Sequence, residues 1–520
     1  MRRHSDTFRG NCPAFRIEKL FANIAGVTKC RPAVLRLSMG ITACFLLGTI
    51  QYCGAGAAAN SAEERRQAVE THLSRYIRLM GQQDSGLSLT SEMKRLHVPA
   101  VSIAAIQDSR VDWARAYGVS PSGKSIQTST VFGAASISKA VTAMGVLRLV
   151  QDGRLPLDED VNRYLKRCKL AENQFTVEKK VTVRELLSHT SGIGTHNGEI
   201  LDPANGLPNL VQIFQGEKPA GTPPVRVEAI PGSSFAYSNG GYLVLALLVE
   251  DVTGERFADY MKRVVLDPIG MRDSTYESIL PPAYLDRAAT AYTDGGQAIP
   301  PSQFAEPNPS AGGLWTTPLD LAKFLIEFQR EYQGKSTKVL NAQTIQTLLN
   351  PGTFQAKFRP WGLGFEVAGS PANRYVRHGG SGFFQTDMLL YLHGSGIVVM
   401  TNSWGGSALA EELLRSADTV YGFPDFQTKE RTAVSIDPLL LPRFVGTYGF
   451  VKVSLGQGGL TAEIPIGTPP QRLYASLPTH FFVLDGPQEL DFSLDEKQMV
   501  TSVEFSTPMV KRRLLKTDPK

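Results

Sequence analysis

The sequence predicts an α+β domain followed by a small antiparallel β-barrel or sandwich. Strand patterns lie near both ends of residues 60–428 and helical patterns lie between them, so one sheet is expected to join the two ends of this stretch. After about residue 430, short alternating segments separated by turn residues replace the helical patterns. The chain of 520 residues is longer than one domain usually needs, which favours two folded units, residues 60–428 and 436–520.

The composition is that of an ordinary globular protein. Hydrophobic residues make up 42% and charged residues 20% of the chain, which excludes intrinsic disorder, a collagen-like repeat or a coiled coil as the dominant architecture. The 54 Lys and Arg residues exceed the 49 Asp and Glu residues by only five. Because both signs are interspersed and no basic block occurs, nucleic acid is not an expected partner. The expected partner is a small-molecule or peptide substrate; the oligomeric state is left open.

Residues 1–59 are interpreted as a leader and signal peptide. The window from Arg36 to Glu63 contains no charged residue between its ends, and Leu37 to Ile50 is largely apolar. That length suits the apolar region of a signal peptide and is short for a membrane span. Small residues at Ala55 and 57–59 offer cleavage sites. We therefore expect a secreted or periplasmic protein, with an uncleaved membrane anchor as the alternative; the long stretch before residue 37 would also fit a start codon further downstream.

The cysteines point to neither a disulfide nor a metal centre. Four of the five lie within the first 53 residues, so Cys168 alone remains after removal of a leader. No Cys-x-x-Cys pair or Cys/His spacing typical of zinc is present. Nothing around Cys168 reads as an activating environment, so a structural role is expected.

Three elements can be placed from residue spacing. Apolar runs on either side of residues 107–110 predict a β-hairpin over residues 99–119. Apolar residues recurring at helical spacing predict a helix over 136–152, ended by Gly153. A second hairpin is expected over 384–402, with its turn at 393–396. Short strands are then expected at 451–453, 460–464, 472–475, 481–484, 490–494 and 503–505.

The segment Ser136-Ile137-Ser138-Lys139 places a serine and a lysine three residues apart at the start of the predicted helix. Residues at this spacing share one helix face, so the Lys amine can reach the Ser hydroxyl. A serine is a nucleophile only when a neighbouring base takes its proton. The first turn of a helix also offers backbone N–H groups to a developing oxyanion. Lys139 can serve as the base only if its pKa is lowered, by burial or by a nearby cation.

The same spacing recurs at Ser91-Glu92-Met93-Lys94, as expected by chance for so short a pattern. This second copy lies in a polar stretch before the first predicted strand. We interpret it as a solvated helix face. The copy at Ser136 instead follows an apolar run and opens a long helix, which is the context that the chemistry requires.

Two further stretches are compatible with a catalytic site. Tyr237-Ser238-Asn239 precedes an apolar run; a Tyr hydroxyl can share a proton relay with a lysine, and an Asn amide can orient lysine and substrate. The structural alternative is a helix N-cap by Ser238 or Asn239 beside a packed tyrosine. His378-Gly379-Gly380-Ser381 leads into the second hairpin, where glycines permit a close approach of substrate; the alternative is a turn with a surface histidine.

In this order, the motifs resemble those of the serine β-lactamase and penicillin-binding protein family. The resemblance is to the class C-like branch of that family, which includes DD-peptidases, D-aminopeptidases and esterases. The resemblance covers about residues 85–425. It implies a β-lactamase/DD-peptidase-like fold: an antiparallel sheet flanked by helices, plus an all-helical subdomain. Residues 436–520 resemble the lipocalin-like domain appended to some members. The supporting stretches lie at 149–155, 183–192, 311–314 and 361–364.

The resemblance implies a role for each motif residue. Ser136 would be the acylated nucleophile, Lys139 and Tyr237 the shared general base and acid, and Asn239 a group that binds a substrate amide and positions the lysine. The N–H groups of Ser136 and Ser381 would form the oxyanion hole. The remaining substrate-binding residues would be His378, Gly379 and Gly380. His189 lies in a segment usually regarded as structural and is left out of the site; no metal or organic cofactor is implied.

One departure from the family pattern bears on the substrate. Many β-lactamases and DD-peptidases carry Lys-Thr-Gly, whose Lys and Thr help to hold a substrate carboxylate, where this chain has His378-Gly379-Gly380. A partly neutral histidine and a glycine would hold a carboxylate less firmly. The leading interpretation is therefore an exported serine hydrolase acting on an ester or amide. The alternatives are a β-lactamase or DD-carboxypeptidase, and a non-catalytic penicillin-binding or sensor protein that keeps the pocket without turnover.

Overall fold

The computed structural model describes residues 61–517, apart from 82–86, 196–199, 351–360, 466–469 and 509. The predicted leader and signal peptide lie outside these residues. Within the described part of the chain, no helix is both long enough and apolar enough to cross a membrane.

A six-stranded antiparallel sheet forms the centre of the first unit. Both predicted hairpins are confirmed, and β2 pairs with β11, so the sheet joins the two ends of this unit as expected. The strands, in spatial order, are β3 (Arg110–Gly118), β2 (Ala100–Gln107), β11 (Gly396–Thr401), β10 (Gln385–Tyr391), β9 (Tyr375–Gly380) and β8 (Glu366–Ala368).

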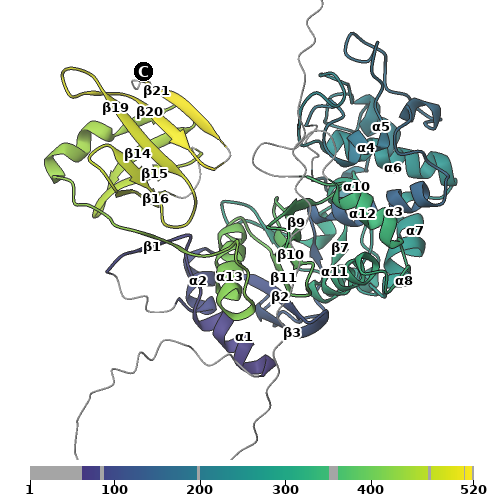
Figure 1. The fold of residues 1–520 in the computed structure, drawn as a ribbon, viewed down its shortest axis with the longest axis horizontal. Coiled ribbons are helices and arrows are strands. Elements are labelled where there is room, and N and C mark those ends of the chain that lie inside the picture. The colour runs from purple at the N-terminus through teal and green to yellow at the C-terminus, as the bar shows by residue number, and fades with distance from the viewer. Residues whose placement is uncertain are drawn as a thin grey trace, which may run out of the picture. The chain divides into compact units, whose positions relative to one another are not determined.

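Helices cover both faces of this sheet, because each central strand is apolar on both faces. Along β2, Ala104 and Ile106 belong to one buried cluster while Ile103 and Ala105 belong to another. The second cluster includes residues of α13 (Gly406–Tyr421) and α1 (Ala62–Thr71); the first includes residues of α3 (Ile137–Gln151) and α11 (Pro318–Tyr332). Figure 1 shows α1 and α13 beside the strands, and α3 and α11 on the side of the remaining helices. The sheet is therefore the middle layer of three.

The predicted helix over 136–152 is confirmed as α3, and Gly153 follows it with a φ of 70°. Almost every residue of α3 is buried, so this is a central helix rather than an amphipathic surface helix. It contacts α6 (Asn239–Thr253), which in turn contacts α4 (Val183–Leu187) and α5 (Leu210–Gln215). These helices form the part of the fold without large sheets (Figure 1).

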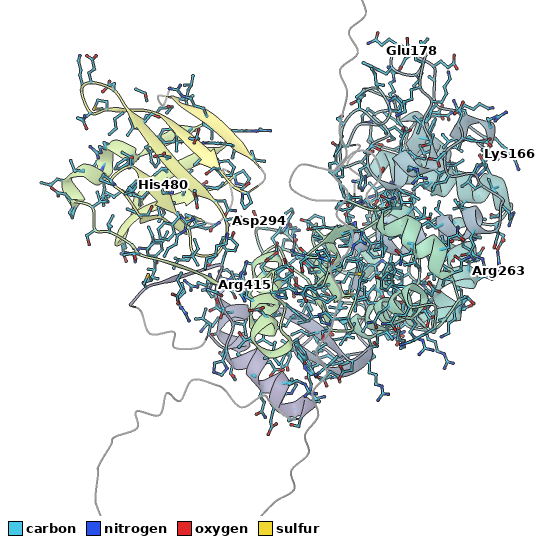
Figure 2. The ribbon with its side chains drawn as sticks, in the orientation of Figure 1. Lys166, Glu178, Arg263, Asp294, Arg415 and His480 are labelled. Atoms are coloured by element: carbon cyan, nitrogen blue, oxygen red, sulfur yellow. The ribbon has the colours of Figure 1, made fainter. Side chains whose placement is uncertain are left out.

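The remaining elements of this unit are short. The helices are α2 (Leu89–Arg95), α7 (Phe257–Met261), α8 (Asp267–Ile269), α9 (Pro282–Leu285), α10 (Pro309–Gly312) and α12 (Ala342–Leu349), with a π-helical turn at Lys262–Leu266. Two small pairs are β4 (Phe132–Gly133) with β7 (Trp315–Thr316) and β5 (Ala291–Tyr292) with β6 (Ala298–Ile299). Charged side chains of both signs, such as Lys166 and Glu178, lie exposed on the surface (Figure 2).

The C-terminal unit is a nearly closed antiparallel barrel, one of the two folds predicted for it. The described strands follow the order β16 (Gln471–Arg472), β15 (Gly459–Glu463), β14 (Val451–Gly456), β13 (Gly446–Tyr448), β21 (Lys511–Thr517), β20 (Val500–Ser506), β19 (Glu489–Leu494), β18 (His480–Phe482) and β17 (Tyr474–Ala475). The two outermost strands, β16 and β17, are separated in sequence by Leu473 alone, so the sheet must curl until its edges meet. The interior is a separate apolar cluster that contains Phe444, Tyr448 and Phe492.

Two features of the C-terminal part differ from the sequence prediction. Strands β13 and β21 were not predicted, because the first is very short and the second is the basic, largely exposed segment Lys511–Thr517. The single strand expected at 472–475 is divided in two. In addition, β12 (Lys429–Arg431) lies in the stretch between the two predicted domains, where it pairs in parallel with β1 (Ile77–Leu79).

Candidate active site

Ser136 immediately precedes α3, at a strained point of the backbone. Ala135 has a φ of 45°, which is unusual for a residue other than glycine and is commonest at functional sites. The neighbouring carbonyl of Ala134 accepts a hydrogen bond from Thr386 Oγ1 at 2.9 Å, which ties this turn to β10. Ser136 occupies the N-cap position but its side chain makes no capping hydrogen bond. Its hydroxyl is thus available for chemistry instead of being used to begin the helix.

Lys139 is fully buried one turn further along α3. Its Nζ lies 3.1 Å from Ser136 Oγ and donates a hydrogen bond to the carbonyl of Ala311 at 2.8 Å. Burial disfavours the ammonium and lowers the pKa of Lys139 to about 7, although the negative charge of Glu306 opposes this. A large fraction of the lysine is therefore a neutral amine at neutral pH. That amine lies within reach of the serine proton, as a general base requires.

Tyr237 contacts the same serine from the start of α6. The Tyr237 side chain interacts with that of Ser136, and Lys139 Nζ lies 4.9 Å from the centre of the tyrosine ring. Burial raises the pKa of Tyr237 above its usual value, so the phenol keeps its proton at neutral pH. Of the two candidate bases, the lysine is thus the one able to accept a proton, and the tyrosine is the one able to donate.

The residues around Tyr237 fix its position. Ser238 is the N-cap of α6: its Oγ accepts a hydrogen bond from the N–H of Gly241 at 2.9 Å, so the structural alternative holds for this serine. The N–H of Ser238 donates to Nδ1 of His189 at 3.1 Å. The His189 ring is 1% exposed and lies 4.2 Å from the Tyr237 ring, centre to centre. His189, left out of the predicted site, therefore packs directly against it.

Strand β9 brings a second backbone N–H group close to the nucleophile. A Cβ atom on Gly380 would lie 2.5 Å from the carbonyl oxygen of Ala134 and 3.0 Å from Cβ of Ala135, so only glycine allows this approach. Ser381 directly follows the strand. Among the described residues, the N–H groups of Ser136 and Ser381 donate no hydrogen bond. Both groups are therefore free to donate to an oxyanion, and the oxyanion-hole role that the family resemblance implies for them stays a prediction.

His378 lies on the same face of β9 as Gly380, two residues away, and is 2% exposed. Burial, with a smaller contribution from the charge of Lys139, lowers the pKa of His378 to about 3. The imidazole is consequently neutral throughout the physiological pH range. Gly379, between them, is exposed and belongs to the opposite face, so the structure does not bring it together with the other predicted residues.

A wall of the site was not predicted from the sequence. Lys139 donates to the carbonyl of Ala311 in α10, and the Nδ2 group of Asn308 donates to the backbone carbonyl of Asn239 at 3.0 Å. Glu306 accepts a hydrogen bond from the N–H of Asn308 at 3.1 Å. Part of the Glu306 side chain reaches solvent, yet protein atoms surround its carboxyl group and raise its pKa to about 7.

The structure thus brings together Ser136, Lys139, Tyr237, Gly380 and His378. Asn239 contributes its backbone carbonyl, which accepts the hydrogen bond from Asn308. Among the described residues its side chain makes no hydrogen bond to Lys139, so no contact supports the predicted role in positioning the lysine. Sequence reasoning missed Glu306, which lacks a motif of its own. It also assigned no role to Trp361, whose ring lies 5.3 Å from the rings of both His189 and His378.

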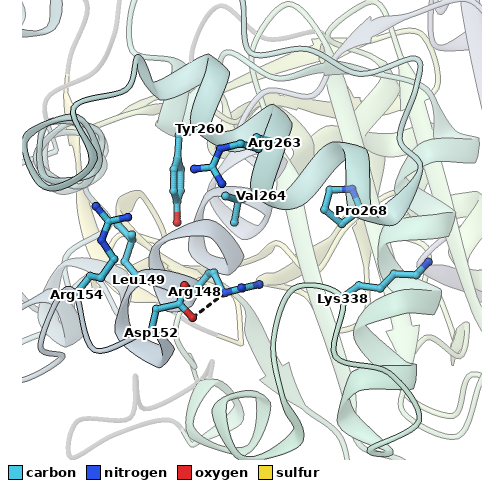
Figure 3. Close-up of a pocket in the computed structure, with 9 residues that line it drawn as sticks. All are labelled: Arg148, Leu149, Asp152, Arg154, Tyr260, Arg263, Val264, Pro268 and Lys338. Atoms are coloured by element: carbon cyan, nitrogen blue, oxygen red, sulfur yellow. Dashed lines mark hydrogen bonds and ion pairs between the residues drawn. The ribbon is translucent and has the colours of Figure 1, made fainter.

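A hollow elsewhere on the molecule lacks this chemistry. It measures about 250 Å³ and lies at the far end of α3, about 20 Å along the helix axis from Ser136 (Figure 3). Its arginines already have partners: Arg148 is bonded to Asp152, and Arg263 is bonded to Glu255.

No group of three or more potential metal ligands occurs within the described ranges. Cys168 is a buried free thiol whose pKa is raised by burial to about 11.

A sheet covered by helices on both faces, with a serine and a buried lysine at the start of the central helix, is the arrangement typical of the β-lactamase and penicillin-binding protein fold. A family model for β-lactamase matches residues 88–420, and the chain belongs to that family. It is 26% identical over 408 residues to penicillin-binding protein 4* of Bacillus subtilis, covering 71% of this chain and 84% of that one.

Solved structures share the fold. The octameric penicillin-binding protein homologue from Pyrococcus abyssi is 21% identical, with a TM-score of 0.55, over 82% of this chain and 98% of that chain. A D-stereospecific amidohydrolase from Streptomyces is 20% identical, with a TM-score of 0.50, over 64% of this chain and 98% of that chain.

Proposed function

We propose that this protein hydrolyses an ester or amide bond through an acyl-enzyme on Ser136. The observation that carries the proposal is the distance of 3.1 Å between Ser136 Oγ and Nζ of the fully buried Lys139. In acylation, Ser136 Oγ attacks the substrate carbonyl while its proton passes to the neutral Lys139 amine. The N–H groups of Ser136 and Ser381 stabilise the negative charge that develops on the carbonyl oxygen.

The proton then leaves with the departing group. Lys139 and the protonated Tyr237 return it to the leaving alcohol or amine as the bond to the acyl carbon breaks. In the second half, water adds to the acyl group with the same residues acting in reverse, which releases the acid and restores Ser136. The net reaction consumes one water for each bond cleaved and needs no metal.

The substrate preference follows from His378. A neutral imidazole provides no positive charge for a substrate carboxylate, whereas the Lys of a Lys-Thr-Gly motif does. We therefore place uncharged esters and amides ahead of penicillins and D-Ala-D-Ala peptides. Penicillin binding is the second candidate, because a relative that is similar over 71% of this chain is named for it. The apolar stretch before residue 60 supports the further proposal that the enzyme is exported.

Covalent labelling tests the nucleophile directly. Incubation with p-nitrophenyl acetate should add one acetyl group to the protein, as measured by intact mass, and the mass shift should map to the peptide that contains Ser136. Ser136→Ala should not be labelled at this position. Ser91→Ala is the matched control: Ser91 shares the Ser-x-x-Lys spacing but lies exposed on α2, and its loss should leave labelling unchanged. Full labelling of Ser136→Ala would refute the assignment.

A further inference from the structure

The hydrogen bonding of His378 identifies which ring nitrogen carries the proton. Nδ1 lies 2.8 Å from the carbonyl oxygen of Gly379. A carbonyl oxygen only accepts hydrogen bonds, so Nδ1 must be protonated and must donate. Since the buried ring is neutral, Nε2 carries a lone pair and no hydrogen. Nε2 is therefore a pure acceptor, and it has no hydrogen-bond partner in the described part of the chain.

Trp361 presents the opposite polarity beside this acceptor. Its ring centre lies 5.3 Å from that of His378, with the two planes 79° apart, and the side chain is 7% exposed. The indole Nε1–H can only donate, and it too lacks a partner among the described residues. Buried polar atoms nearly always have partners, and neither atom of this pair has one among the described residues. Nε2 of His189, whose ring also lies 5.3 Å from that of Trp361, is a third such atom.

We propose that His378 and Trp361 form a subsite for an uncharged amide group of the substrate. The amide N–H donates to His378 Nε2, and the amide carbonyl accepts from Trp361 Nε1. A carboxylate fits poorly, because it carries acceptors only and would face the His378 lone pair. An ammonium group fits poorly as well, because it has no acceptor for the indole N–H. This subsite rests on the proposed acyl-enzyme function and specifies its substrate class.

The side of β9 on which His378 lies connects this subsite to the reacting atoms. Strand residues two apart share a face, so His378 and Gly380 both face the layer that contains Ser136. Gly380 approaches Ala135, the residue before the nucleophile. The ring of Trp361 also lies 6.0 Å from that of Tyr237. A substrate bound at Ser136 therefore lies beside the subsite, at the strand position where the Lys-Thr-Gly relatives hold a carboxylate.

Three esters of benzoylglycine separate the possible preferences. Their leaving groups are glycolamide, glycolate and methyl glycolate, which present an amide, a carboxylate and a neutral group without a donor. For each ester, kcat/KM is divided by the rate constant of its uncatalysed hydrolysis by hydroxide, which corrects for differences in intrinsic reactivity. The normalised kcat/KM of the glycolamide ester should exceed those of the other two esters by about tenfold or more, since a buried acceptor left unpaired opposes binding.

Variants assign the preference to the two rings. His378→Phe keeps an aromatic ring but removes the acceptor, and should reduce the glycolamide preference to about threefold or less. Trp361→Phe removes only the N–H group and should reduce the same ratio. His393→Phe is the matched control: His393 lies exposed in the β10–β11 turn, and its replacement should preserve the wild-type ratio. Comparing ratios within each variant removes any effect on overall activity.

Two results would overturn the subsite: equal normalised kcat/KM values for the three esters in the wild type, or an unchanged preference in His378→Phe. Either leaves Ser136 labelling intact, whereas failure of the proposed function would abolish hydrolysis of every ester. A measurement independent of turnover is long-range ¹H–¹⁵N NMR of ¹⁵N-histidine-labelled enzyme, assigned with His378→Phe. We expect Nδ1 of His378 to be protonated and Nε2 to be bare; a proton on Nε2 would exclude the acceptor role.

Discussion

At the scale of single residues, burial divides the proton chemistry between two neighbours. The same loss of water lowers the pKa of the Lys139 amine and raises that of the Tyr237 phenol. The shifts have opposite signs because desolvation disfavours whichever form is charged, the ammonium in one case and the phenolate in the other. Near pH 7 the phenol is therefore neutral and a large fraction of the lysine is the free amine, so that a lone pair and a proton donor face Ser136 together.

Lys139→Ala and Tyr237→Phe should both slow acylation strongly. Loss of a positioned general acid or base usually lowers the rate by about 10²–10⁴-fold. Stopped-flow measurement of p-nitrophenolate release reports the acylation rate, and circular dichroism reports whether each variant is folded. A folded Lys139→Ala enzyme that acylates at nearly the wild-type rate would show that Lys139 is not the base.

The pH dependence of kcat/KM should report Lys139. The base is active as the free amine, so activity with a neutral ester should rise as pH increases through about 7, where the amine loses its proton. The carboxylate of Glu306 stabilises the ammonium, so Glu306→Gln should lower the pKa of Lys139 and move this rise to lower pH. Glu306 would therefore affect catalysis indirectly, by setting the pKa of Lys139.

Glu331→Gln is the matched control for this profile. Glu331, near the end of α11, is also a carboxyl group whose pKa is raised by burial to about 7. It differs from Glu306 in its partners, because it accepts hydrogen bonds from the N–H groups of Val339 and Leu340. Its replacement should leave the position of the pH profile unchanged. A shift of equal size in both variants would mean that general destabilisation, and not the charge beside Lys139, moves the profile.

At the scale of elements, spacing predicts what is local. The two hairpins and α3 were predicted correctly because the apolar residues of each element follow a strand or helix periodicity within one continuous segment. The approach of Gly380 to Ala135 could not be predicted from spacing, because the two residues lie 245 positions apart and meet only through the packing of β9 on α3. Glu306 and Trp361 were missed for the same reason: each acquires its role from a neighbour distant in sequence.

Gly380→Ala tests this approach of strand to helix. The added Cβ would overlap Thr386 Oγ1 at 2.3 Å and the Ala134 carbonyl at 2.5 Å, so the backbone of β9 must move. Overpacking of this kind typically destabilises a protein by about 1–3 kcal/mol, and a shift of the strand would also move Ser381 N–H away from the oxyanion position. Thermal unfolding and the acylation rate should both be impaired.

Gly382→Ala provides the comparison, because a Cβ at Gly382 meets no atom within 4 Å and its backbone φ does not require glycine. Its melting temperature should remain close to that of the wild type. Equal losses of stability in the two variants would show that contact with Ala134 is not what requires glycine at position 380.

At the scale of the whole molecule, the described residues form several apolar clusters. Two lie on the faces of the six-stranded sheet, a third fills the barrel, and a small fourth joins Ile77 and Leu79 of β1 to Phe482 of β18. The change in composition near residue 430 predicts a boundary between the hydrolase unit and the barrel, and this boundary stays a prediction. The segment beyond residue 428 includes β12, which pairs with β1 near the start of the hydrolase unit. This pairing leads us to expect that the hydrolase unit extends through Arg431, a few residues beyond residue 428.

Truncation should reveal this boundary. A chain that ends at residue 433 keeps β12 and both clusters of the sheet, so it should remain folded and be labelled at Ser136, because every residue placed in the site precedes position 382. A chain that ends at residue 427 loses the pairing of Ile77–Leu79 with Lys429–Arg431, and should melt at a lower temperature than the longer fragment. Differential scanning calorimetry and acyl labelling of both fragments measure these outcomes.

If the chain ending at 433 is recovered only as insoluble protein, the barrel is needed for folding and the hydrolase is not an independent unit. If it folds and is labelled but its kcat/KM values for the three benzoylglycine esters change relative to one another, the barrel contributes to substrate choice.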